Sequence, residues 1–320
     1  MTVQVLSMEM ESRPCPLSCE AGDEFLFTGT DRLHGLPGEF RVVRCRGCGL
    51  MRTDPRPAPG SMGAFYPSDY SPHLYTRVTG RPHATSRRSW KRTVRALLDT
   101  RAEALPGMPA GRMLEIGCAS GSYLHRMASE GWSVEGIEFS SAAADSARRL
   151  GHRVFEGRVE DAPEPEARFD LIVAWMALEH LYEPLAVLRR LRRWIRPDGW
   201  LVFSVPNAGS LEFAVFRDAW YALQLPTHLY HYTPRTLRKL LDHSGWVLEQ
   251  VIHQRTISNL VASIGYALRD RGFRSVGASL VAYPERSGRS HDLLFPAAWL
   301  LASIGQTGRM TVWARPEEVG

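Results

Sequence analysis

The sequence is almost without lysine. Of its 39 basic residues only Lys91 and Lys239 are lysines, and all the others are arginines. A GC-rich coding genome produces this skew, so the net charge of +5 does not by itself indicate a nucleic-acid partner. No run of five or more basic residues occurs without an apolar interruption. We therefore do not expect nucleic acid as a partner, although the arginine-rich surface keeps that alternative open.

Long apolar runs are also missing. No stretch reaches the roughly 18 apolar residues that a membrane-spanning helix needs, and the first fifteen residues lack the basic start and apolar core of a secretory signal. We therefore expect a cytoplasmic protein without a transmembrane segment. Hydrophobic residues make up 44% and charged residues 23% of the 320 residues, which is a globular composition with room for one domain and an accessory module.

Cysteine is scarce beyond the first 50 residues, since Cys118 is the single cysteine in the rest of the sequence. The other four cysteines form two close pairs, C-P-L-S-C and C-R-G-C-G, at Cys15, Cys19, Cys45 and Cys48. Each pair can turn two thiolates toward one point, and the hairpin between the pairs can bring the points together, which is typical of a zinc ribbon. Four thiolates leave no open coordination position, so the spacing predicts a structural Zn²⁺ in a module over residues 1–60. Unrelated reduced cysteines and disulfides are the alternatives, and disulfides are not expected in a cytoplasmic chain.

Residues 61–110 read as a linker followed by an amphipathic helix. The segment after the second cysteine pair is rich in proline and glycine. Farther on, Trp90, Val94, Leu97 and Leu98 recur at helical spacing with arginines between them. We expect this helix to cover a sheet edge.

From residue 111 to residue 320, short apolar strands alternate with helices of 10 to 13 residues. Alternation of this kind predicts an α/β fold with a doubly wound, mostly parallel, seven-stranded sheet. The predicted strands are 112–117, 132–140, 152–157, 168–178, 200–207, 246–253 and 309–315. No crossover helix pattern separates the last two strands, so we expect them to pair antiparallel at an edge. Insertions are expected at about 206–233 and 255–308, and the apolar stretches in 255–305 are interpreted as core or interface helices, with a homodimer surface or a lid over a lipid-linked substrate as alternatives.

The turn after the first strand, E-I-G-C-A-S-G-S, carries the clearest chemical signal. Gly117 and Gly121 allow a sharp turn and close approach of the backbone to a ligand. The segment is neither a G-x-G-x-x-G fingerprint nor a P-loop. Glu115 precedes the turn and would suit a cationic or amine-bearing ligand, while Glu138, at the end of the second strand, can accept both hydroxyls of a ribose. Together these residues predict an adenosine-containing ligand.

Four segments in this order resemble the class I S-adenosylmethionine-dependent methyltransferases: E-I-G-C-A-S-G-S, G-I-E-F-S, F-D-L-I-V-A-W-M-A-L-E-H and R-P-D-G-W-L-V-F-S-V-P-N. The resemblance covers about residues 105–254 and the terminal strand. The four-cysteine module, the Y-P-S-D-Y segment and L-P-T-H-L-Y-H-Y-T-P look like a subgroup with an added zinc-binding domain. That subgroup includes sugar C-methyltransferases and enzymes of polysaccharide and natural-product biosynthesis.

The resemblance implies a Rossmann-like fold, S-adenosylmethionine as cofactor and a set of residues that hold it. Glu115 and the backbone from Gly117 to Gly121 would hold the methionine part, and Glu138 the ribose. Arg158 stands where the family often has an acid for the adenine amine, so backbone near Val159, or the side chains of Glu160 or Asp161, would substitute. Cys118 is interpreted as a small packed residue beside the cofactor. The implied cofactor-binding residues are Glu115, Gly117, Cys118, Ala119, Gly121, Glu138, Phe139, Val159 and Trp175.

Three histidines are candidates for proton transfer. His180 closes the loop after the fourth strand, which in the resembled fold lies beside the methyl donor, and a neutral imidazole there can accept a proton from an acceptor. His228 and His231 lie in the insertion where this fold builds substrate pockets. We predict His180 as the general base, with Glu179 or the loop backbone fixing its tautomer. The alternatives are a base at His228 or His231, or histidines that only hydrogen-bond or pack.

The sequence thus predicts a methyltransferase acting on a small-molecule acceptor, with a sugar or a natural-product or polysaccharide intermediate favoured by the subgroup resemblance. Two alternatives remain. One is an RNA methyltransferase that uses the zinc ribbon and arginines, and the other is a zinc-stabilised protein that binds the cofactor without catalysis. Oxygen, nitrogen and carbon are all open as the accepting atom.

Overall fold

The computed structural model describes residues 8–66, 102–286 and 290–318. Its centre is a seven-stranded sheet with the order β12-β13-β10-β9-β6-β7-β8. The strands are β6 (Arg112–Ile116), β7 (Ser133–Glu138), β8 (Arg153–Glu156), β9 (Phe169–Trp175), β10 (Ile195–Pro206), β12 (Trp246–His253) and β13 (Arg309–Pro316). The pairs among β6, β7, β8, β9 and β10 are parallel, and β13 runs antiparallel to both of its neighbours. The doubly wound, mostly parallel sheet is confirmed.

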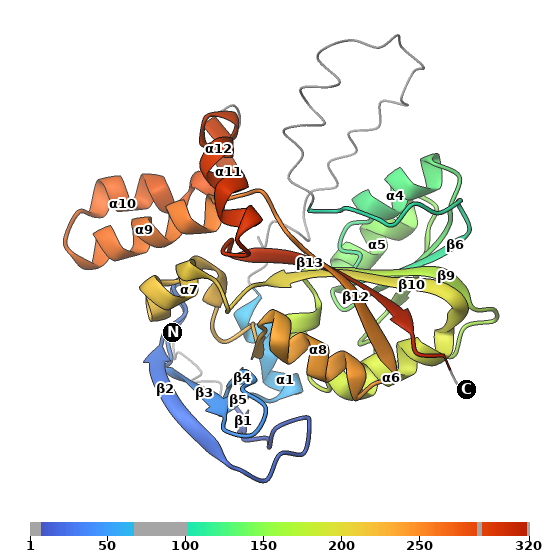
Figure 1. Cartoon of the computed structure of the whole chain (residues 1–320), viewed down its shortest axis with the longest axis horizontal. Helices are drawn as coiled ribbons and strands as arrows, with labels where there is room; N and C mark the ends of the chain where they lie inside the picture. Colours follow the sequence, from blue (N-terminus) through green and yellow to red (C-terminus); the bar gives the residue numbers. More distant parts are fainter. Residues whose placement is uncertain (1–7, 67–101, 287–289, 319–320) are drawn as a thin grey trace, which may run out of the picture.

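Helices cover both faces of this sheet because successive residues of each strand point to opposite sides. Figure 1 shows α4 (Ser122–Ser129) and α5 (Ser141–Arg149) on one side, and α6 (Pro184–Trp194) and α8 (Pro234–Asp242) on the other. In β6, Met113 belongs to one apolar core and Leu114 to the other. The Thr233 hydroxyl accepts from the Thr236 amide at 3.2 Å and Pro234 occupies the first turn, so α8 begins where its cap residues predict.

The N-terminal residues form a small antiparallel sheet that is completed by a strand from much later in the chain. Its order is β11-β4-β3-β2, from strands β2 (Asp23–Gly29), β3 (Phe40–Cys45), β4 (Met51–Thr53) and β11 (Tyr230–His231). A separate pair joins β1 (Met10–Glu11) to β5 (Arg56–Pro57), followed by α1 (Pro59–Met62) and the short 3-10 turn η1 (Gly63–Phe65). Because β11 comes from the 206–233 insertion, the insertion and the cysteine module share one sheet.

Two insertions lie between strands of the central sheet. The first follows β10 and holds α7 (Leu211–Phe216), the 3-10 turns η3 (Arg217–Ala219) and η4 (Tyr221–Leu223), and β11. The second follows β12 and holds α9 (Ser258–Asp270), α10 (Arg274–Val281), α11 (Tyr283–Arg286) and α12 (Ser290–Ser303). The apolar stretches expected as helices correspond to α9 and α12, whereas α10 has no counterpart in the sequence prediction.

The last two strands pair antiparallel at one edge of the sheet, as expected, with β12 outermost and β13 between β10 and β12. Helix α6 ends at Trp194, and residues 197–199 form an irregularity inside β10 between Ile195 and Trp200. The amphipathic helix predicted around Trp90 lies outside the described residues.

Candidate functional site

The turn after β6 adopts the left-handed backbone that the glycine spacing predicts. Gly117 and Gly121 have φ values of +71° and +83°, and Ala119 between them has φ +47°. A Cβ atom on Gly121 would lie 2.7 Å from the Cβ of Ala147, so α4 and α5 approach too closely for any side chain there. The turn therefore lies at the carboxyl end of β6, where ligands bind in sheets of this kind, and Gly117 is its exposed residue.

Glu138 ties the end of β7 to this turn. One carboxylate oxygen accepts from the Ala119 amide and the other from the Ser140 amide, each at 2.8 Å. These bonds fix the carboxylate at the carboxyl end of β7, and carboxylate oxygens are acceptors of the kind that ligand hydroxyls need. The neighbouring Phe139 is 54% exposed, so its ring face is open to an apolar or aromatic ligand group.

Glu115, in β6 just before the turn, is buried. It is 3% exposed, and its Oε2 atom has no hydrogen-bond partner among the described residues. Burial raises the pKa of Glu115 well above its usual range, and nearby Glu103 raises that pKa further. A buried carboxyl group with a free oxygen is suited to a ligand that brings its own donor, such as an ammonium group. Trp175, at the end of β9, packs edge-to-face on Tyr123 at 5.2 Å between ring centroids.

Two further residues named for the cofactor, Cys118 in this turn and Val159 after β8, have buried side chains. Cys118 is 2% exposed, and burial raises the pKa of its thiol. A Cβ atom on Gly136 would lie 2.6 Å from its sulfur, so Cys118 fills the space that this glycine leaves. Val159 is 3% exposed, and Arg158 pairs with Glu160 and Asp161 at 3.6 and 3.7 Å. Cys118 is thus placed to support the turn through packing, whereas Val159 belongs to the other apolar core.

The loop after β9 brings a second group of polar residues to the same edge of the sheet. Because β9 is the neighbour of β6, a Cβ atom on Gly117 would lie 3.2 Å from the Cβ of Ala177 in this loop. The loop continues as the 3-10 turn η2 (Leu178–His180). Glu179 within it is fully buried, and neither carboxylate oxygen has a hydrogen-bond partner among the described residues. Burial raises the pKa of Glu179 to about 8, against the lowering effect of its own backbone amide and of Arg309.

His180 is oriented by backbone rather than by Glu179. Its Nδ1 atom lies 2.9 Å from the carbonyl oxygen of Thr227 and 3.1 Å from the Tyr66 hydroxyl. A carbonyl oxygen can only accept, so Nδ1 carries the proton and Nε2 keeps its lone pair. Burial lowers the pKa of His180 to about 4, so the imidazole is neutral at pH 7. Its side chain is only half-buried, which leaves it within reach of an acceptor.

His228 packs against His180, whereas His231 points into the cysteine module. The His180 and His228 rings meet edge-to-face at 4.7 Å between centroids, and Nδ1 of His228 donates to the Ala222 carbonyl at 2.9 Å. Burial, then His180 and His231, lower the pKa of His228 well below its usual range. The Nε2 atom of His231 lies 3.4 Å from Thr53 Oγ1, whose proton goes to the His228 carbonyl at 2.8 Å. The structure therefore brings His180 and His228 together and places His231 in the interface with β4.

The sequence prediction missed three polar residues at this end of the sheet. Tyr66, which contacts His180, belongs to the Y-P-S-D-Y segment, whose resemblance was the available signal. Glu212 is 2% exposed, accepts from the Gly308 amide at 3.0 Å, and has a pKa raised to about 7 by burial. Arg309 at the start of β13 acts on the pKa values of Glu179 and Glu212. Glu212 comes from the first insertion and Arg309 from the start of β13. No local sequence motif marks a pair that is brought together from two distant segments.

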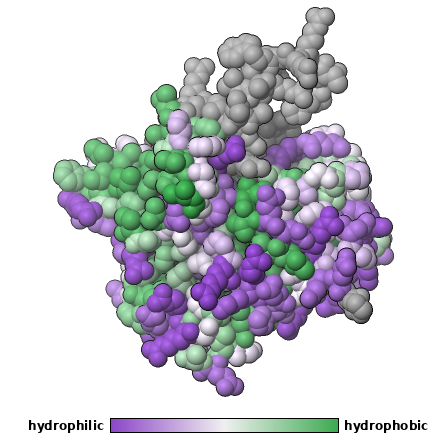
Figure 2. Space-filling view, viewed as in Figure 1, coloured by the Kyte–Doolittle hydropathy of each residue, from purple (hydrophilic) through white to green (hydrophobic). Residues whose placement is uncertain are grey.

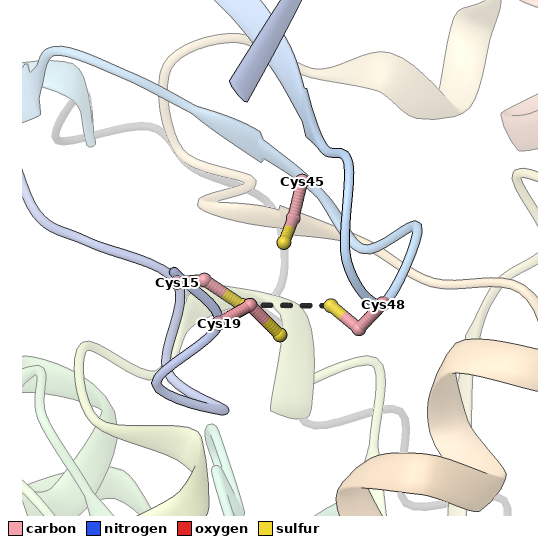
Figure 3. Close-up of side chains that lie close together, drawn as sticks. All are labelled: Cys15, Cys19, Cys45 and Cys48. Carbon is pink, nitrogen blue, oxygen red and sulfur yellow. Dashed lines mark hydrogen bonds between the residues drawn. The ribbon is translucent and has the colours of Figure 1, made fainter. Parts of the chain in front are cut away.

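The four N-terminal cysteines converge on one point. Figure 3 shows their sulfur atoms facing a common centre, and all four lie within 4.8 Å of one another. The Cys15 and Cys48 sulfurs are 3.5 Å apart and all four cysteines are free thiols rather than disulfides. Zn–S bonds of 2.3 Å in a tetrahedron require sulfur separations of roughly 3.8 Å, so this arrangement fits zinc.

Local backbone geometry explains why the longer first pair still closes. Ser18 has φ +53° and its amide donates to the Cys15 carbonyl at 2.9 Å, which turns the chain between Cys15 and Cys19. Gly49 has φ +85° and its amide donates to the Cys45 carbonyl at 2.9 Å. The second pair is also anchored to α8, because Lys239 Nζ donates to the Cys48 carbonyl at 3.1 Å.

Comparison with known proteins gives one family and several relatives. A family model described as a methyltransferase domain matches residues 86–251, just over half of the chain. A ubiquinone biosynthesis O-methyltransferase of Alkalilimnicola ehrlichii is 33% identical over 139 residues, which cover 40% of this chain and 55% of that protein. A malonyl-[acyl-carrier protein] O-methyltransferase of Serratia marcescens is 29% identical over 220 residues, 62% of this chain and 84% of that protein. This chain thus spans about half the length of the ubiquinone relative.

Among solved structures, an S-adenosylmethionine-dependent methyltransferase from Mesorhizobium loti is 19% identical, with a TM-score of 0.45 and coverage of 70% of this chain and 96% of that chain.

Proposed function

Because this chain belongs to the methyltransferase family whose model it matches over residues 86–251, we propose that it transfers a methyl group from S-adenosylmethionine to a small-molecule acceptor. One observation carries the proposal. The left-handed turn at Gly117–Gly121 and the polar loop at Glu179–His180 follow adjacent parallel strands and contact each other at Gly117 and Ala177. A cradle for the cofactor and a group able to take a proton thus lie at one edge of the sheet.

The residues of the cradle fit the parts of S-adenosylmethionine. The free Oε2 of Glu115 suits the methionine ammonium group, the carboxylate of Glu138 suits the ribose hydroxyls, and the exposed ring of Phe139 suits adenine. The backbone of Gly117, Ala119 and Gly121 can approach the ligand closely because two of the three residues lack a side chain. When bound, the cofactor supplies an activated methyl group on a sulfonium, and the protein's task is to align an acceptor with it.

His180 is the proposed general base. Its Nδ1–H points to the Thr227 carbonyl, so Nε2 is the atom that would accept the acceptor's proton. The low pKa of about 4 keeps that atom unprotonated at neutral pH, and the half-buried position lets an acceptor reach it. His228 has the same tautomer but is 2% exposed, so we assign it to support of the His180 ring. His231, in contact with Thr53, is assigned to the joint between the insertion and the cysteine module.

We propose that Cys15, Cys19, Cys45 and Cys48 hold one structural Zn²⁺. The convergence of four free thiols supports this, and the pairing of His231 with Met51 connects the metal module to the insertion that carries His228. The zinc would therefore stabilise one wall of the acceptor site from outside it, without taking part in methyl transfer.

For the acceptor we propose a sugar or an intermediate of natural-product or polysaccharide biosynthesis. The subgroup resemblance of the cysteine module supports this class. The two relatives are named for ubiquinone biosynthesis and malonyl-[acyl-carrier protein], so their names also favour metabolite-sized acceptors over nucleic acid. Several arginines are also engaged within the chain, for example Arg52 with Asp23 and Arg148 with Glu156, which reduces the positive surface open to RNA.

The proposal is tested by incubating the purified protein with methyl-labelled S-adenosylmethionine and panels of nucleotide sugars, polyketide or phenolic intermediates, and bulk RNA. We expect label in a small molecule together with an equal amount of S-adenosylhomocysteine. Label in RNA alone would replace the proposed acceptor class, and cofactor binding without turnover on any acceptor from the matching biosynthetic context would favour a non-catalytic role.

A further inference from the structure

The second insertion carries an apolar surface that no described element covers. It is formed by α9, α10, α12 and the turn between α9 and α10, which Figures 1 and 2 show gathered at one corner of the molecule. We call it the insertion face. Its exposed apolar residues are Ile264, Phe273, Val276, Leu293, Trp299, Leu300 and Ile304. Leu293 is 82% exposed and Phe273 60% exposed, far from the burial that such side chains usually find.

Helix α12 is the clearest part of this face. Its sequence S-H-D-L-L-F-P-A-A-W-L-L-A-S is apolar on every side after the first turn. Among its described side chains only Ala298 is buried. A helix that is apolar all round normally lies inside a protein or in contact with lipid, because water cannot solvate that surface favourably. The helix has 14 residues, and among the described residues none of the helices is long and apolar enough to cross a membrane.

Positive charge surrounds the apolar tip of the face. The turn between α9 and α10 reads R-G-F-R, so Phe273 lies between Arg271 and Arg274, and all three are exposed. Arg269, near the end of α9, is exposed as well. The nearby acid Asp270 is already paired, since Arg32 donates two hydrogen bonds to its carboxylate at 2.9 and 3.0 Å. Aromatic and aliphatic side chains flanked by arginines are the pattern of segments that lie in the interface of an anionic membrane.

The charge arrangement favours lipid over a second copy of the chain. In a two-fold contact the same patch meets itself, so Arg271 and Arg274 of one copy would face a patch that carries the same arginines in the other copy. The acidic side chains described on α9, α10 and α11 are Asp270 and Glu285, and Asp270 is engaged by Arg32. Self-association of the face would thus bring like charges together with few acids to offset them, whereas anionic head groups complement them.

We propose that the insertion face binds the surface of an anionic membrane, with Phe273 and α12 in the head-group region and Arg269, Arg271 and Arg274 contacting lipid phosphates. Helix α12 ends at Ser303, shortly before Arg309 opens β13 at the acceptor edge of the sheet. Membrane contact at this face therefore holds the acceptor edge close to the lipid surface. The proposal concerns binding and is independent of the methyl acceptor.

The direct test is co-sedimentation of the full-length protein with vesicles at about 0.1 M salt. One set contains phosphatidylglycerol in phosphatidylcholine, and the other phosphatidylcholine alone. We expect binding to the anionic vesicles that weakens as salt rises, and weak binding to neutral vesicles. Arg271→Gln combined with Arg274→Gln should weaken binding by roughly 30-fold, since each arginine near an anionic surface contributes about fivefold. The pair Arg235→Gln and Arg238→Gln, exposed on α8, removes the same charge elsewhere and should change binding little.

The apolar contribution is tested with Phe273→Ser against Phe25→Ser. Both phenylalanines are exposed, at 60% and 53%, but Phe25 lies on β2 in the cysteine module. Phe273→Ser should weaken vesicle binding about fivefold or more while Phe25→Ser leaves it near wild type. Circular dichroism and cofactor affinity confirm that each variant is folded.

Two results would overturn the proposal. The first is the absence of binding to anionic vesicles at low salt. The second is a dimer in light scattering that Phe273→Ser dissociates, because the face would then be covered by a second copy of the chain.

Discussion

The Nδ1 atom of His180 lies 2.9 Å from the carbonyl oxygen of Thr227, so a residue of the insertion sets the tautomer of the histidine in the loop after β9. Thr227 lies just before β11, and β11 pairs with β4 of the cysteine module. The orientation of the proposed base thus depends on a chain of contacts that runs from the cysteine cluster through β4 and β11 to Thr227.

Replacement of the base should separate catalysis from cofactor binding. We expect His180→Ala to lower turnover by roughly 10²-fold or more, the usual scale for loss of a general base, with cofactor affinity changed no more than a few-fold. Single-turnover rates measured with the identified acceptor check this, and His243→Ala, at an exposed histidine after α8, serves as the histidine control. A near-normal rate for His180→Ala beside a collapsed rate for His228→Ala would assign the base to His228 instead.

Buried histidines should make the fold sensitive to acid. Burial lowers the pKa of His231 to about 3, below the value of about 6.5 in an unfolded chain. The unfolded state therefore binds the proton first, and the stability from the neutral form is lost as pH falls from about 6.5 toward 3. Below pH 6 the free energy of unfolding of the wild type should fall as the pH decreases. For His231→Gln, measured by denaturant unfolding, this fall should be less steep by about 1.4 kcal/mol per pH unit.

The control for this measurement is His243→Gln, because His243 is exposed. It should retain the wild-type slope, and an unchanged slope for His231→Gln as well would show that His231 does not contribute to the acid sensitivity.

Much of the fold follows from local patterns in the sequence. The alternation of apolar strands and helices predicted the seven-stranded sheet, and Thr233 and Pro234 marked the start of α8. The pairing of β11 with β4 was not predictable, because two residues in an insertion carry no periodicity and the partner strand lies about 180 residues earlier, as the Thr53–His231 contact shows. Long-range pairing of this kind is set by tertiary packing rather than by propensity.

In the candidate site, too, local features were predictable from the sequence and long-range contacts were not. Gly117, Ala119 and Gly121 form the left-handed turn that the glycine spacing indicates, since a tight turn needs left-handed residues at fixed positions. The polar contacts of His180 were only half predicted. Glu179 or the backbone of the loop after β9 was predicted as the orienting partner, whereas the contacts are with Thr227 of the insertion and Tyr66, each of which lies far from His180 in the chain.

Loss of zinc should act on catalysis from a distance. Purified protein is expected to contain about one zinc per chain, and Cys45→Ser should remove it and speed hydrogen exchange of β3, β4 and β11. Because β11 directly follows the segment of Thr227, which orients His180, loosening β11 should lower turnover. Cofactor affinity should stay within a few-fold. Elemental analysis and hydrogen exchange check this, with Cys118→Ser as a control that keeps its zinc. A zinc-free wild-type protein prepared without chelator would contradict the assignment.

A methyl group at Gly121 should be far more costly than one at Gly131. Both glycines have positive φ values, +83° and +95°, so alanine strains the backbone by roughly 1 kcal/mol at either position. The added Cβ would lie 2.7 Å from Ala147 Cβ at Gly121, but 3.8 Å from Ala110 Cβ at Gly131. We expect Gly121→Ala to lose about 1–3 kcal/mol more than Gly131→Ala in denaturant unfolding, and to weaken cofactor binding. Equal losses would mean that the close contact of α4 and α5 is relaxed at little cost.

The central claim is that the edge formed by β6 and β7 binds S-adenosylmethionine through Glu138. Calorimetric titration of S-adenosylmethionine and S-adenosylhomocysteine into the wild type, Glu138→Ala and Glu156→Ala tests it most directly, since Glu156 is an exposed carboxylate at the end of the neighbouring strand β8. The account predicts about one ligand per chain, a loss of roughly 1–3 kcal/mol for Glu138→Ala, the scale of a hydrogen bond to a charged group, and near wild-type affinity for Glu156→Ala. Unchanged affinity in Glu138→Ala, or no binding by the wild type, would contradict it.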